Sequence, residues 1–150
     1  MARFTHPAVV RSGSSDTNTW QIVGGTLGAT QPTFSSAPLF SGSYNIMDHL
    51  CNFAIDVEMS NILTFGDGQY YMLLPEPSKH NVIISGGCLH DASTSKQYFI
   101  IGDVDAGSDI MKLVTVTSNG LQVPFSDSDG TPVKLATADT FHITGSYITL

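Results

Sequence analysis

The chain has 150 residues, a length that suits one domain able to bury roughly 70% of its unfolded surface. Only 13% of the residues are charged, and 6 Lys and Arg against 13 Asp and Glu give a net charge of −7. That charge repels phosphate backbones and anionic lipid, and no run of about 18 apolar residues predicts a membrane span, so we expect neither nucleic-acid binding nor membrane insertion.

The hydrophobic content of 41% indicates a folded chain rather than a disordered one. The sequence divides into two predicted units, an N-terminal attachment arm over residues 1–36 and a β domain over residues 37–150. The first residues lack the apolar core of a signal peptide, so we expect synthesis in a cytoplasm.

The arm is irregular, and glycines interrupt its apolar residues. A segment that carries a large aromatic but cannot build its own core is expected to pack on the body of the protein or on a neighbouring subunit. The predicted attachment contacts are Phe4, Trp20, Ile22 and Leu27.

Strand patterns follow one another from residue 39 onward, and no stretch shows helical spacing. The clearest alternation lies in residues 50–59, where every second residue from Cys51 to Met59 is apolar. The predicted strands cover residues 39–46, 50–59, 69–74, 81–91, 96–104, 110–117 and 140–149.

Turn residues separate these strands. Gly66 and Gly68 predict a turn before the third strand, Pro75 and Pro77 end it, and residues 86–87 (GG) predict a bulge or a sharp bend. Short strands with such turns favour an all-β antiparallel β-sandwich, jelly-roll-like, with an extended N-terminal arm.

A repeated Gly-Ser-Tyr triplet occurs at residues 42–44 and 145–147. If the first and last strands of the β domain lie side by side, each tyrosine would cover the glycine of the other strand. Chance similarity of the two triplets is the alternative.

Cysteine and histidine are close together at two places, His49 with Cys51 and Cys88 with His90. Each pair offers only two ligands, whereas structural zinc requires four. We therefore predict two buried free thiols and no metal site.

No catalytic motif is present, so we predict no catalytic residue, no cofactor and no enzymatic activity. A small enzyme would require a cleft that gathers His90, Asp91 and a serine. The aspartates of two loops read as turn residues, because the EF-hand pattern fails, although a weak structural calcium stays open; they are Asp103, Asp105, Asp109, Asp127 and Asp129.

Five segments carry a resemblance to a known family. They are residues 65–75 (FGDGQYYMLLP), 87–91 (GCLHD), 96–98 (KQY), 106–109 (AGSD) and 137–147 (TADTFHITGSY). From about residue 32 onward the chain resembles a β domain found in tailed-bacteriophage structural proteins, at the C-terminal end of minor tail, fibre or head-fibre proteins. The resemblance implies a virion component assembled as a symmetric oligomer, a trimer, without catalysis.

We therefore expect a non-enzymatic virion surface protein, a capsid decoration, head-fibre or minor tail subunit. It would bind major capsid or tail proteins through its arm and the neighbouring face of the β-sandwich. Head and tail are not distinguished. The trimer seam is predicted at Tyr70, Tyr71, Phe141 and Tyr147, with burial in the core of one subunit as the alternative.

A second hypothesis is an adsorption module of the tail that binds a host receptor or a cell-surface glycan. Its aromatic residues would stack on a sugar face, and the candidates are Trp20, Tyr44 and Tyr98.

Overall fold

The computed structural model describes residues 18–19, 24–127 and 132–150. Within these residues the protein is all-β, as predicted, and contains no helix that could cross a membrane. The strands are β1 (Asn18–Thr19), β2 (Gly24–Thr26), β3 (Thr33–Phe34), β4 (Leu39–Met47), β5 (Leu50–Glu58), β6 (Ile62–Thr64), β7 (Tyr70–Leu73), β8 (Val82–Asp91), β9 (Lys96–Val104), β10 (Ile110–Val116), β11 (Gln122–Pro124) and β12 (Thr140–Ile148).

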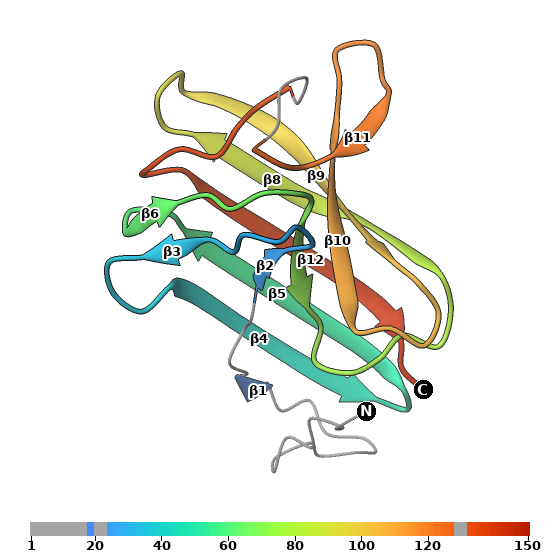
Figure 1. Ribbon diagram of the computed structural model, residues 1–150. Coiled ribbons are helices and arrows are strands. Elements are labelled where there is room, and N and C mark those ends of the chain that lie inside the picture. Colours follow the sequence, from blue (N-terminus) through green and yellow to red (C-terminus); the bar gives the residue numbers. More distant parts are fainter. Residues whose placement is uncertain (1–17, 20–23, 128–131) are drawn as a thin grey trace.

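The described strands form one large antiparallel sheet and a small ribbon. The large sheet has the order β1-β4-β5-β12-β8-β9-β10-β7-β2, with β11 paired to β10, and the ribbon joins β3 to β6. Figure 1 shows the sheet curling, so that β2 and the β3–β6 ribbon cross in front of β5 and β12. The core lies between these two layers, which gives the antiparallel sandwich, whereas this strand order does not confirm a jelly-roll topology.

The long strands lie where the sequence predicts them, because their period-2 alternation corresponds to real burial. In β5, Cys51, Phe53, Ile55 and Val57 are buried and the intervening side chains face outward. The short strands β1, β2, β3, β6 and β11 were not predicted, since two or three residues cannot display a period.

The predicted pairing of the first and last strands of the β domain is wrong. β5 lies between β4 and β12, and Phe53 is the cross-strand partner of both Tyr44 and Gly145. A Cβ added to Gly145 would come within 3.2 Å of the Phe53 ring and 2.6 Å of Ile84. Phe53 and Ile84 therefore cover the glycine that we expected Tyr44 to cover.

The predicted glycine features are confirmed where the backbone can be compared. Gly66 and Gly68 have φ values of 74° and 83°, the left-handed region that glycine tolerates. The register between β8 and β9 shifts between Ile84 and Gly87, which corresponds to the bulge, one of the two features predicted there.

Part of the predicted arm belongs to the large sheet. β2 pairs with β7 from Gly24↔Met72 to Thr26↔Tyr70, and Asp67 of the next turn exchanges hydrogen bonds with Thr30, donating its N–H to the Thr30 carbonyl and accepting from the Thr30 N–H. The body of the fold thus includes residues 24–36.

Candidate functional site

The predicted attachment residues are only partly visible. Phe4, Trp20 and Ile22 lie outside the described residues. Leu27 follows β2, and 51% of its surface is exposed. An exposed leucine beside a paired strand is available to a neighbour, so Leu27 stays a candidate contact.

The predicted seam residues pack mainly inside one chain. Tyr70, Phe141 and Tyr147 are buried, and Tyr71 is half-buried. The Tyr147 hydroxyl donates to the Glu76 carbonyl at 2.8 Å and accepts from the Glu76 N–H at 3.2 Å, while burial raises its pKa. Tyr70, Phe141 and Tyr147 therefore belong to the core of one subunit, which is the alternative that the sequence left open.

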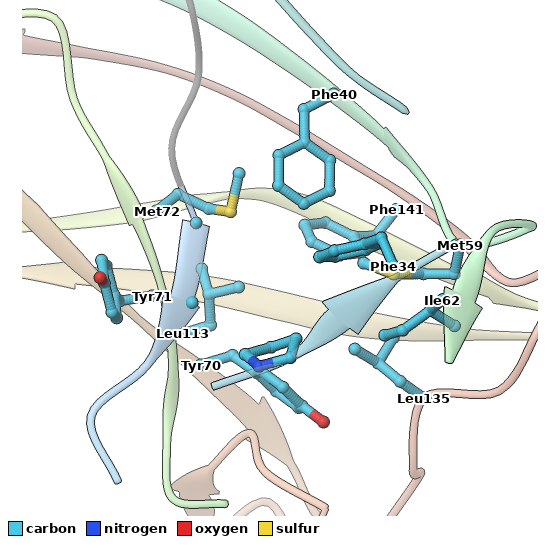
Figure 2. Close-up of a pocket in the computed structure, with 13 residues that line it drawn as sticks. Phe34, Phe40, Met59, Ile62, Tyr70, Tyr71, Met72, Leu113, Leu135 and Phe141 are labelled. Atoms are coloured by element: carbon cyan, nitrogen blue, oxygen red, sulfur yellow. The ribbon is translucent and has the colours of Figure 1, made fainter. Parts of the chain in front are cut away.

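An apolar cavity lies between the two layers. Figure 2 shows the rings of Phe34, Phe40 and Phe141 gathered above Ile62 and Leu135. Phe34 meets Phe40 edge to face, with ring centroids 5.8 Å apart. The cavity volume of about 20 Å³ holds roughly one water molecule, so this space is a packing gap rather than a ligand site.

His90 and Asp91 do not form a cleft together. His90 is exposed on the outer face of β8, whereas the Asp91 side chain turns inward and is buried. Asp91 accepts hydrogen bonds from the N–H and hydroxyl groups of both Ser93 and Thr94, at 2.6–3.2 Å. These bonds lower the Asp91 pKa to about 2 and stabilise the β8–β9 turn.

The two cysteines differ in environment. Cys51 is buried, and this burial raises its pKa to about 12, so the thiol stays protonated. Cys88 is half-buried on the outer face, where its cross-strand partner is His142. The burial predicted for both thiols therefore holds fully for Cys51 alone.

The outer face also aligns three groups that the sequence did not connect. The His142 Nδ1 atom lies 2.9 Å from Asp56 Oδ1, and Cys88 is on the opposite side of His142. Among the described residues no hydrogen bond joins Cys88 to His142. The Cys88 thiol instead lies 3.9 Å from the Leu89 carbonyl oxygen. This row lacks the contact between nucleophile and base that acyl-transfer chemistry requires.

The loop carboxylates are arranged around a cation of the protein itself. Lys112 Nζ lies 2.9 Å from Asp105 and 3.8 Å from Asp103. Asp129 is outside the described residues, and within them no cluster of His, Cys, Asp or Glu is arranged to hold a metal ion.

A groove opens where β9 and β10 separate. The two strands pair at five positions, from Val104↔Met111 to Ile100↔Thr115. Beyond Ile100, β9 stays with β8 as far as Lys96↔Asp91, while β10 stays with β11 as far as Val116↔Gln122. The strands form a fork, which Figure 1 shows where the β10–β11 hairpin rises away from β9.

The groove encloses about 510 Å³, within the range of ligand pockets in proteins. Its described lining comes from Gln97, Tyr98 and Phe99 of β9, Val116 of β10, Thr117 and Ser118 of the following turn, and Pro132. Phe99 is 74% exposed, the largest exposure among the large hydrophobic residues described. None of these lining side chains is charged.

The sequence points to Tyr98 but not to its neighbour Phe99. The available signal is the run of four apolar residues 98–101 (YFII), because a strand with one wet face alternates instead. Such a run implies an apolar side chain on the outer face. The fork itself has no local signal, since it depends on which strands pair.

Comparison with known proteins places the fold. No family model and no curated protein matches the chain. Among solved structures, the crystal structure of the Dettilon tailspike protein (gp208) superposes with a TM-score of 0.60 at 16% identity, over 89% of this chain. The match covers 23% of the tailspike chain, so this chain spans about a quarter of that protein's length. The β fold described here is therefore similar to one part of a phage tailspike.

Proposed function

We propose that this protein is a non-enzymatic structural component of a phage virion, exposed on the particle surface and associated with the tail. The observation that carries this proposal is the superposition of 89% of the chain on part of a tailspike protein. The phage-like segments of the sequence support the same assignment independently.

The outer face of β4, β5 and β12 is suited to packing against a neighbour. Asn45, Asn52 and Ser146 form one cross-strand row, in which the Ser146 hydroxyl donates to Asn52 Oδ1 at 2.6 Å. Short, uncharged side chains in this row let two sheets approach closely, and interface cores are depleted of charge; the charged residues of the same face, Asp56 and Glu58, lie toward its other end. At the end of the same face lie exposed apolar residues, Met47, Leu50 and Ile148, that are cross-strand neighbours.

We propose that this outer face forms the contact between subunits of a trimer. An Asn52→Arg variant places a charge at its centre and is expected to convert the trimer to a monomer in light scattering. Leu63→Arg is the matched control, because Leu63 is exposed on β6, outside this face. A parent protein that is monomeric at micromolar concentration would contradict the oligomer, and equal behaviour of the two variants would contradict the face.

Attachment is proposed to use the N-terminal residues. The test variant begins at Asn18, because a chain beginning at Gln31 would also lose β2 and the contact between Thr30 and Asp67. The Asn18 variant is expected to fold like the parent and to be missing from purified particles, as measured by immunoblot. Undiminished incorporation would place the contact elsewhere.

A second candidate function is adsorption to the host surface through a bound carbohydrate. The observation that favours it is the groove with the exposed Phe99 ring at the β9–β10 fork. Two of the predicted sugar-stacking residues lie within the described residues. Tyr98 lines this groove and packs partly against the core, whereas Tyr44 is buried.

A further inference from the structure

We propose that the fork between β9 and β10 is a binding site for a neutral oligosaccharide, with Phe99 as its stacking platform. This inference rests on the proposed surface location and adsorption role, and it adds the site, the residues and the ligand class.

The first argument is the shape of the site. A regular sheet has no space between neighbouring strands, which lie about 4.8 Å apart. Here β9 and β10 separate after Ile100↔Thr115, and each is held by a different partner strand. Both walls of the groove are therefore fixed before a ligand arrives, which reduces the entropy lost on binding.

Each wall of the groove ends in a hydrogen-bonded turn of its own hairpin. On the β9 side, Asp91 accepts four hydrogen bonds from Ser93 and Thr94. On the β10 side, Thr117 exchanges backbone and side-chain hydrogen bonds with Leu121, at 2.8 Å and 3.0 Å. Each hairpin thus stabilises its own wall of the groove.

The second argument is the chemistry of the lining. Phe99 offers an apolar ring face to solvent, where burial by a ligand gains the most. The Gln97 amide and the Ser118 hydroxyl have no hydrogen-bond partner among the described residues, so both can donate to and accept from a ligand. An apolar ring beside neutral donors and acceptors matches a sugar, which has an apolar face and a rim of hydroxyl groups.

The third argument selects the charge of the ligand. No described lining residue carries a positive charge that could form an ion pair with a carboxylate or phosphate, and the chain carries a net charge of −7. An acidic saccharide would lose hydration without gaining an ion pair and would be repelled over longer range. The site therefore favours neutral hexose and N-acetylhexosamine units.

The test uses the full-length protein on a panel of neutral oligosaccharides and, in parallel, oligosaccharides that contain uronic or sialic acid. We expect saturable binding to members of the neutral set, followed by calorimetry with the tightest neutral binder. Phe99→Ala is expected to weaken that binding by about tenfold or more, because one aromatic stack is lost. Gln97→Ala is expected to weaken it less.

Ile83→Ala is the matched control, since Ile83 is an exposed apolar residue on β8 outside the groove, and it should bind like the parent. Absence of binding across the neutral set, binding to acidic members alone, or equal binding by Phe99→Ala and the parent would each overturn the proposal. Concentration-dependent self-association that Phe99→Ala abolishes would also overturn it, because the groove would then be a contact between copies.

Incorporation into particles separates this inference from the proposed function. Phe99→Ala should be incorporated at the parent level. If it is incorporated and the sugar result is negative, only the groove assignment fails; if the parent protein is absent from particles, the virion role fails.

Discussion

The two halves of the large sheet differ in how far neighbouring strands stay paired. β5 pairs with both β4 and β12 in unbroken register over the length of the strands, from Leu39↔Glu58 to Met47↔Leu50 and from Thr140↔Glu58 to Ile148↔Leu50. β9 and β10 pair only from Ile100 to Val104 and then separate. The continuous half supplies a rigid scaffold, whereas the forked half leaves an aromatic ring and free polar groups open to solvent.

The largest effect on stability should come from replacing a buried phenylalanine of the continuous half, compared with the same replacement of an exposed phenylalanine in the forked half. Phe53 is 5% exposed and contacts Tyr147 edge to face, with ring centroids 6.0 Å apart, whereas Phe99 is mostly exposed. We expect Phe53→Ala to lower the free energy of unfolding by about 3–5 kcal/mol. Phe99→Ala should change it by less than about 0.5 kcal/mol.

Urea-induced unfolding of both variants measures this difference directly. Similar losses in the two variants would mean that Phe99 is buried in solution, which would contradict the open fork.

A smaller effect is expected at the bulge that joins the halves. A Cβ added at Gly87 would lie 2.2 Å from the Ile100 carbonyl oxygen, and backbone must move to relieve the contact. Gly87→Ala should therefore cost about 1–3 kcal/mol, measured by thermal or urea unfolding. Gly120→Ala is the control for backbone strain alone, because Gly120 has φ of 79° and no atom within 4 Å of the added Cβ.

Gly120→Ala should cost about 1 kcal/mol from its left-handed backbone. A Gly87→Ala variant that is no less stable than the Gly120→Ala variant would show that β8 and β9 are not in close contact at the bulge.

The smallest effect concerns acid stability of the turn beside the fork. The folded pKa of Asp91 is about 2, below its ordinary value of 3.8, so its hydrogen bonds stabilise the fold at neutral pH. This contribution is complete above about pH 4–5 and is lost as the pH falls toward 2. The stability of the parent should therefore decrease in this window more than that of Asp91→Asn.

Unfolding midpoints measured between pH 7 and pH 2 test this prediction. Thr94→Val removes one donor to Asp91 and should show part of the same change. Parallel pH profiles for the parent and Asp91→Asn would contradict the proposed role of the carboxylate.

The long strands could be predicted because their signal is local. Cys51 to Met59 alternate in sequence and in burial, and the glycines at 66, 68 and 86–87 mark turns and a bulge that require them. Strand order could not be predicted, because pairing depends on distant residues. The Gly-Ser-Tyr triplets suggested a contact that β5 prevents, and Tyr70, Phe141 and Tyr147 fit a core as well as a seam.

The candidate site was only partly predictable for the same reason. Tyr98 can be selected as an aromatic with a polar hydroxyl, but the exposure of Phe99 depends on β10 leaving β9 after Thr115. No residue in the segment 96–99 encodes that separation by itself.

Both margins of the large sheet end in very short strands. β1 covers β4 only at Tyr44 and Ser43, and β2 covers β7 over three residues. β4 is longer than the strand that covers it, so within the described residues most of its outer backbone has no partner strand. An open edge of this kind can accept a strand from another chain. Removal of Asn18 and Thr19 would open the two covered positions as well and lengthen the edge available for strand addition.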